Sequence, residues 1–235
     1  IVPPESYNRR TWELCKEFDI LYVADEVITA FGRLGHFFAS KDFFGIEPDV
    51  ITFAKGITSG YQPLGGLVFS DAIHKTLVEA EPQAPFINGY TYTAHPASCA
   101  AALANIALME RENICGRVKA DGVYFEARMR ELVDLDVVGD VRGSHYMICI
   151  ESVKNKITKE PFPASVGIGD LIAKNAGDLG LIIRPVGSMN ILSPPLILTR
   201  SQIDDFAQLM RAAIVRTQEQ LAADGSLTTS ATPPA

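Results

Sequence analysis

The strongest constraint on the fold is a set of short apolar runs, each followed by polar or glycine-rich sequence. The runs span residues 20–24, 49–53 and 65–69. Apolar runs of this length, bounded by turn-forming residues, are typical of strands buried in a parallel sheet. Because helical patterns alternate with the runs, the sequence predicts an open α/β sheet in the first half of the chain.

Helical patterns flank the predicted strands. Residues 7–18 are expected to form one helix, and Asp71 is expected to cap another that extends through Val78. Pro96 suits the first turn of a third helix. The residues that follow it, 97–109, are small and apolar, which predicts a helix buried against close neighbours.

The second half of the sequence mixes pairs of strands with helices, which predicts a smaller α+β domain. We therefore expect part of a large domain in residues 1–115 and the small C-terminal domain in residues 116–222. Residues 223–235 are rich in Ser, Thr and Pro and are expected to be disordered. The expected helices of the small domain are 116–135, 166–179 and 202–221, and its expected strands are 137–141, 147–151, 181–184 and 190–192.

Composition narrows the functional classes. The formal net charge of −7 argues against a nucleic-acid-binding protein, which would carry a basic face. No Cys-x-x-Cys pair occurs and the four histidines show no metal-ligand spacing, so we expect no metal site. We find neither a signal peptide nor an apolar run near the roughly 20 residues of a membrane span, and expect a cytoplasmic protein without a membrane partner. The chain begins without Met, so we expect that the N-terminal part of a longer protein is missing.

Lys55 is the first candidate for chemistry, because it follows the second apolar run and precedes a glycine-rich loop, residues 56–65. A lysine at the buried end of a strand is partly desolvated, which favours its neutral amine. A neutral amine can attack a carbonyl carbon and form a Schiff base. The alternative interpretation is a lysine whose ammonium group reaches water from the end of the strand.

Asp25 is the second candidate, because it ends the first apolar run. Taken by itself, it is a loop or helix-capping carboxylate, and Asp25-Glu26 also has the form of a Walker B element. No Gly-x-x-x-x-Gly-Lys-Ser/Thr motif accompanies it in this sequence, which weakens an interpretation as an ATPase-type binding protein.

Asp25 and Lys55 together are more informative than either residue. Their separation of 30 residues matches one strand–loop–helix–strand unit, so both are expected at the carboxyl edge of the same sheet. An acid and an amine at one edge could hold an aromatic cofactor between them. Pyridoxal 5′-phosphate requires this combination, with a lysine for its aldehyde and an acid for its ring nitrogen.

At these motifs the sequence resembles the class III (subgroup II) pyridoxal-phosphate-dependent aminotransferases of fold type I, over about residues 1–222. The resemblance implies an α/β fold type I PLP-transferase, with a large domain built on a mostly parallel sheet, partly contained in this chain, and a smaller α+β C-terminal domain. The matching segments are LYVADEVITAFGRLG (21–35), PDVITFAKGITSGYQPLGG (48–66), NGYTYTAHP (88–96), GLIIRPVG (180–187) and SPPL (193–196).

The resemblance also implies roles for residues of the cofactor site. Lys55 would carry the internal aldimine, and Asp25 would keep the pyridine nitrogen protonated. Val27 would pack on the face of the ring. Thr91, with Tyr90 beside it, would reach the cofactor phosphate of the neighbouring subunit, which implies a homodimer with shared active sites.

Three candidate residues, Arg184, Thr91 and Val27, have more than one interpretation. In the resembling enzymes the arginine that matches Arg184 binds the substrate carboxylate, yet this residue could equally be a strand-edge arginine paired with a surface carboxylate. Thr91 could cap the helix that begins near Pro96. Val27 could belong to the hydrophobic core.

Ile28 bears on the substrate. Many family members that act on 4-aminobutyrate or ornithine have Gln immediately after Asp-Glu-Val, whereas this chain has Ile. The resemblance therefore favours an ω-transaminase that moves an amino group from an ω-amino acid or primary amine to pyruvate by a ping-pong mechanism. The alternatives are a 1,2-aminomutase of the glutamate-semialdehyde type, a 4-aminobutyrate or ornithine-type aminotransferase, and a catalytically silent family member.

Overall fold

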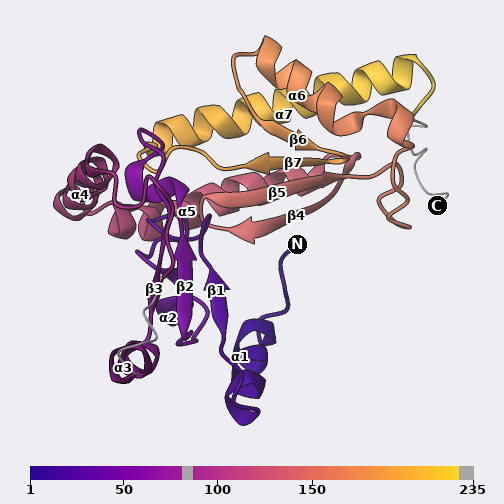
Figure 1. The fold of residues 1–235 in the computed structure, drawn as a ribbon. Helices are drawn as coiled ribbons and strands as arrows, with labels where there is room; N and C mark the ends of the chain where they lie inside the picture. The colour runs from indigo at the N-terminus through magenta and orange to yellow at the C-terminus, as the bar shows by residue number, and fades with distance from the viewer. Residues whose placement is uncertain (81–86, 228–235) are drawn as a thin grey trace. The chain divides into compact units, whose positions relative to one another are not determined.

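The computed structural model describes residues 1–80 and 87–227, and the chain divides into two compact units, Ile1–Lys119 and Ala120–Ala235. Both units contain helices and a sheet, so the α/β class expected from the sequence is confirmed (Figure 1). The domain boundaries expected after residues 115 and 222 stay predictions.

The first unit contains a three-stranded sheet of β1 (Val23–Asp25), β2 (Val50–Phe53) and β3 (Gly66–Phe69), in the order β1-β2-β3. β1 and β2 are parallel, and Asp25 pairs with Thr52. β3 is antiparallel to β2 and departs from the expected parallel arrangement. A parallel return needs a crossover, which usually contains a helix, whereas the loop between β2 and β3 holds only the short 3₁₀-helix η1 (Lys55–Thr58).

The strands of the first unit are more exposed than the sequence predicts. Only Ala24 is buried in β1, and all four residues of β3 are exposed. The expectation of fully buried strands is therefore wrong for this chain. A parallel sheet is buried only where helices cover both of its faces, and the elements of this unit leave most of those faces open.

The helices of the first unit begin close to the expected residues. They are α1 (Tyr7–Glu17), α2 (Ala39–Asp42), α3 (Asp71–Glu79) and α4 (Pro96–Arg111). The predicted cap of α3 is wrong: Ser70 is the N-cap, because its hydroxyl accepts from the Ile73 N–H, and Asp71 is the first helical residue.

The predicted burial of α4 is also wrong for this chain. Pro96 does occupy the first turn, but only Ser98, Ala102 and Met109 of the helix are buried. The side chain of Leu103 is 69% exposed. Small apolar residues predict that a helix can be packed closely, but they do not identify the surface that covers it.

The second unit is built on an antiparallel sheet in the order β4-β5-β7-β6. Figure 1 shows α6 and α7 side by side along this sheet. The buried side chains between helices and sheet include Phe125, Ile148, Ile150, Met210 and Ile214. The remaining elements begin with α5 (Ile114–Arg130), which starts in the first unit and continues into the second. They continue with η2 (Glu131–Asp134), β4 (Val138–Ser144), β5 (Met147–Ser152), η3 (Ala164–Val166), α6 (Ile168–Asp178), β6 (Arg184–Val186), β7 (Met189–Leu192) and α7 (Arg200–Ala223).

The expected disordered tail, 223–235, is described only at its beginning. Ala223 ends α7, and the Leu227 N–H donates a hydrogen bond of 2.9 Å to the carbonyl of Leu221. Residues 228–235 lie outside the described residues.

Metal-binding clusters and membrane-spanning helices are both absent from the described residues. No group of three or more His, Cys, Asp or Glu side chains in residues 1–80 and 87–227 could hold a metal ion. In the same residues, every helix falls short of the length and apolar character that a bilayer span requires.

Candidate active site

The register of β1 and β2 places the two candidate residues at one edge of the sheet. Asp25 is the last residue of β1 and lies opposite Thr52 in the parallel pair. Lys55 follows the end of β2 after a single intervening residue, Ala54. Both residues therefore lie beyond the carboxyl ends of adjacent parallel strands, as their spacing predicts. In open α/β sheets this edge is where ligands bind.

The carboxylate of Asp25 is anchored through one oxygen. Its Oδ1 accepts hydrogen bonds from the Val27 N–H at 3.1 Å and from the Thr52 hydroxyl at 3.3 Å. Within the described residues, its Oδ2 receives no hydrogen bond, and the residue is exposed. One oxygen thus fixes the orientation while the other is available to a ligand.

Lys55 is exposed, so the predicted desolvation of its amine is wrong for this chain. The residue begins η1 with a left-handed φ of 44°, which turns its backbone out of the sheet. The two residues that close η1, Ile57 and Thr58, are buried. The backbone of the turn is therefore packed while the lysine side chain is open to ligand or solvent.

The turn after Lys55 contacts the segment that follows Asp25. A Cβ on Gly56 would lie 2.8 Å from the Cβ of Phe31, which is too close for any residue other than glycine. Phe31 is 2% exposed, has a left-handed φ of 57°, and makes edge contacts with the rings of Phe37 and Phe53. The two segments that leave the sheet edge are thus packed against each other.

Glu26 is a structural residue that the sequence interpretation missed. It is 2% exposed, and its carboxylate accepts hydrogen bonds from the N–H groups of Ala39 at 2.6 Å and Ser40 at 2.8 Å. The hydroxyls of Ser40 and Thr29 also donate to it. The N-cap residue of α2, Phe38, has no side-chain acceptor, so a distant glutamate satisfies the first N–H groups of that helix.

The bonding of Glu26 disfavours the Walker B interpretation. A Walker B glutamate must face a bound nucleotide and its water, whereas this carboxylate is buried and occupied by four donors. The sequence signal that could have revealed the role is a helix start with Phe at the cap position.

Tyr90 and Thr91 lie in an exposed turn before α4. The Tyr90 N–H donates to the Thr93 hydroxyl at 2.6 Å, and the Thr93 N–H donates to the Tyr90 carbonyl at 2.9 Å. The interpretation of Thr91 as a helix cap is wrong, because His95 is the N-cap of α4 and Ala94 has a left-handed φ of 58° between them.

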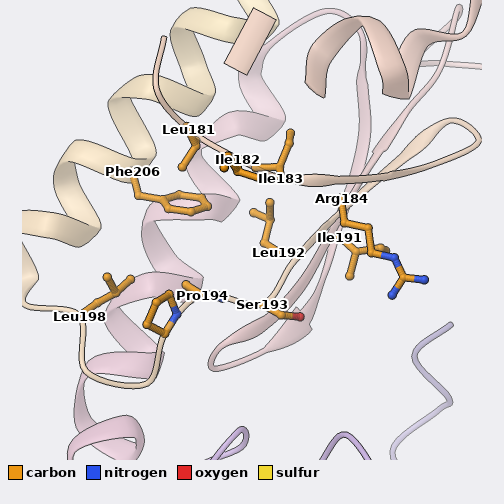
Figure 2. A pocket seen from close by; sticks show the side chains of 11 residues that line it. Leu181, Ile182, Ile183, Arg184, Ile191, Leu192, Ser193, Pro194, Leu198 and Phe206 are labelled. Carbon is orange, nitrogen blue, oxygen red and sulfur yellow. The ribbon is translucent and has the colours of Figure 1, made fainter. Parts of the chain in front are cut away.

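Arg184 begins β6, an edge strand of the sheet in the second unit, and the residue is exposed. No carboxylate among the described residues lies within the 4.0 Å of an ion pair, so this part of the chain offers no partner for the interpretation as an arginine paired with a surface carboxylate. The residue borders a cavity of about 500 Å³ that is lined mainly by apolar side chains, among them Leu181, Ile183 and Phe206. Figure 2 shows the guanidinium directed away from those side chains.

Comparison with known proteins identifies the family. The family model described as aminotransferase class-III matches residues 1–214. The chain belongs to the class-III aminotransferases. The putrescine--pyruvate aminotransferase of Pseudomonas aeruginosa is 42% identical over 218 residues, which cover 92% of this chain and 47% of that protein.

Solved structures agree with the fold. A transaminase from the marine bacterium Virgibacillus is 38% identical with a TM-score of 0.89, covering 94% of this chain and 51% of that one. An amine transaminase from an uncultivated Pseudomonas species, described in the PLP-bound (internal aldimine) form, is 39% identical with a TM-score of 0.87, covering 92% and 49%. The chain spans about half the length of the relatives it matches.

Class-III aminotransferases use pyridoxal 5′-phosphate, and the residues at the sheet edge fit this cofactor. The Oδ2 of Asp25, which receives no hydrogen bond within residues 1–80 and 87–227, can accept one from a protonated ring nitrogen, and the exposed amine of Lys55 is accessible to an aldehyde. Val27 is half-buried next to Asp25. The individual roles of these residues, and those of Tyr90, Thr91 and Arg184, stay predictions.

Proposed function

We propose that this chain carries the lysine and the acid of a pyridoxal-phosphate-dependent transaminase that moves an amino group from a primary amine or ω-amino acid to pyruvate. The observation that carries the proposal is the parallel register of Asp25 with Thr52, because it sets an acid and the turn of Lys55 at one sheet edge. The 42% identity to a putrescine--pyruvate aminotransferase supports the choice of amine donor and keto acid.

Bound pyridoxal phosphate supplies an aldehyde that condenses with amines and a ring that withdraws electrons from the adjacent carbon. The amine of Lys55 would hold the aldehyde of the cofactor. When that amine is free, Lys55 would move a proton, first as general base toward the donor carbon and then as general acid. Asp25 keeps the proton on the ring nitrogen by accepting a hydrogen bond from it.

Arg184 is proposed to bind the carboxylate of the keto acid. A guanidinium offers a planar pair of N–H donors that matches a carboxylate. The absence of an ion-pair partner among the described residues supports this role, since the guanidinium need not first leave a competing carboxylate.

We further propose a homodimer in which the turn of Tyr90 and Thr91 reaches the phosphate of the cofactor bound by the partner. The support is the exposure of this turn, whose Tyr90 and Tyr92 side chains are unusually open for aromatic residues. Residues 1–115 are proposed as part of the cofactor-binding domain and 116–222 as the small domain. The four free cysteines are in keeping with a reducing compartment such as the cytoplasm.

Replacing Lys55 by Ala in the complete protein tests the proposed function. We expect L-alanine formation from pyruvate and a diamine to fall by at least about 10²–10⁴-fold, since the variant lacks the general base. Lys75→Ala is the matched control, because Lys75 is exposed on α3 and the ion pair that it makes within the described residues, to Glu79, is long at 3.8 Å. Retention of near wild-type turnover by Lys55→Ala would contradict the proposal.

The same assay separates transamination from the aminomutase alternative. A transaminase forms one L-alanine for each amine consumed and stops when pyruvate is omitted. An enzyme that moves the amino group within one molecule would continue without pyruvate and form no alanine.

A further inference from the structure

The backbone at Lys55 has a left-handed conformation, which a residue with a side chain adopts only under restraint. Its φ of 44° lies in the left-handed region, which costs a non-glycine residue roughly 1–3 kcal/mol unless surrounding structure holds it. Ser59, just beyond η1, is also left-handed, with a φ of 52°. Because the Lys55 side chain is exposed and makes no ion pair among the described residues, the restraint must act on the backbone of the turn.

Asn105 supplies such a restraint from α4. Its Nδ2 donates hydrogen bonds to the carbonyl of Gly56 at 2.9 Å and to the carbonyl of Ile57 at 3.1 Å. These are the two residues that directly follow Lys55. The side-chain amide has two N–H groups, so a single Asn satisfies two successive carbonyls that lie within the short helix η1.

The turn is also held by packing. Gly56 lies against Phe31 so closely that an added Cβ would meet the Phe31 Cβ at 2.8 Å. Phe31 is itself buried in an aromatic cluster. The backbone after Lys55 is thus restrained twice, by contact with an aromatic side chain and by the hydrogen bonds of the Asn105 amide.

We propose that Asn105 is a positioning residue for Lys55: by binding the Gly56 and Ile57 carbonyls, it fixes the direction in which the lysine leaves the sheet edge. This inference rests on the proposed function, in which Lys55 holds the cofactor and transfers the proton. Asn105 touches neither cofactor nor substrate in this role and acts only through the backbone of the turn.

Three substitutions at this position in the complete protein distinguish the role of the N–H donors. Asn105→Leu keeps the approximate shape and removes both donors. Asn105→Asp places oxygens against the two carbonyls and is expected to be at least as damaging as Leu. Asn105→Gln keeps the amide on a longer side chain and is expected to restore much of what Leu loses.

Ile46→Ala is the matched control for general destabilisation. Ile46 is a 3% exposed residue of the same unit and lies outside the turn formed by residues 55–59. This variant should lower the unfolding midpoint while leaving the kinetics of the remaining folded protein unchanged.

Three measurements carry the test. The first is hydrogen–deuterium exchange without cofactor, in which residues 56–59 should exchange faster in Asn105→Leu than in Ile46→Ala. The second is the rate at which apoprotein captures added pyridoxal phosphate, followed by visible absorbance, which should fall in Asn105→Leu. The third is steady-state kinetics, in which kcat should fall by about 10–100-fold while KM for the amine changes little, because misplacement of the lysine affects the proton-transfer step.

Three outcomes would overturn the inference. The first is an Asn105→Leu variant with wild-type exchange, capture rate and kcat. The second is an Asn105→Leu variant that matches Ile46→Ala in all three measurements. The third is an Asn105→Gln variant that performs no better than Asn105→Leu. The inference and the proposed function fail separately, since a fully active Lys55→Ala variant contradicts the proposed function whatever the behaviour of Asn105.

Discussion

Removal of the buried carboxylate of Glu26 should destabilise the first unit by an amount that the structure allows us to work out. Glu26→Ala leaves the N–H groups of Ala39 and Ser40 and the hydroxyls of Ser40 and Thr29 without their acceptor. The hydroxyls can rotate toward other partners, but the two N–H groups belong to buried residues and cannot. Each buried donor left unpaired costs about 1–3 kcal/mol, so we expect a loss of roughly 2–6 kcal/mol in the free energy of unfolding.

Glu26→Gln sharpens this prediction. The amide oxygen of Gln still accepts from one N–H group of α2, while its NH₂ group faces the other N–H donor. About half of the loss in the free energy of unfolding, roughly 1–3 kcal/mol, should therefore remain. Glu17→Ala is the control, because Glu17 is exposed at the end of α1. That change should stay within about 0.5 kcal/mol of wild type.

Urea unfolding measures the effect. Trp12 is the single tryptophan of the chain and reports on the first unit, where its indole N–H donates to the Glu47 carbonyl at 2.8 Å. Amide exchange at residues 39 and 40 localises the loss. If Glu26→Ala unfolds at the wild-type urea concentration and these amides remain protected, the assignment of Glu26 as the acceptor for the start of α2 is refuted.

Two further predictions concern the second unit. Gly143→Ala should destabilise it by more than about 1 kcal/mol, because Gly143 has a φ of 121° and an added Cβ would lie 2.0 Å from a backbone oxygen of β5. Gly177→Ala in α6, where a Cβ would meet nothing within 4 Å, should instead stabilise slightly in thermal unfolding, and equal effects of the two changes would contradict the reasoning. The hydrogen bond from Tyr124, with Arg128 adding to it, holds the pKa of Asp204 below its ordinary value. Since this pKa is lower in the folded than in the unfolded state, the contribution of Asp204 is present at neutral pH and is lost as the pH falls below about 4. Asp204→Asn should therefore reduce the acid dependence of unfolding, and an unchanged profile between pH 2 and pH 5 would argue against it.

The juxtaposition of Asp25 and Lys55 was predictable because it depends on local patterns. An apolar run predicts a strand, and the polar residue that ends or follows the run lies at its carboxyl end. A separation of one β–loop–α–β unit places two such strand ends side by side at one edge of the sheet. The parallel register of β1 and β2 confirms this reasoning. The fold class followed from the same alternation of runs and helical segments.

The positions that sequence reasoning missed depend on tertiary contacts. Glu26 accepts from residues 13 and 14 positions away, and Asn105 donates to residues 48 and 49 positions away. No periodicity of the sequence encodes such pairs. The burial of Lys55 and of residues 97–109 was wrongly predicted for a related reason, because composition gives the character of a surface but not the element that covers it.

Phe31 connects the segment that follows the acid with the turn that follows the amine. It belongs to the segment that leaves β1, yet its side chain contacts Gly56 in the turn that leaves β2. A different side chain at this one position would change the contact between the two segments. The spacing between the segment after the acid and the turn after the amine therefore depends on the size of residue 31.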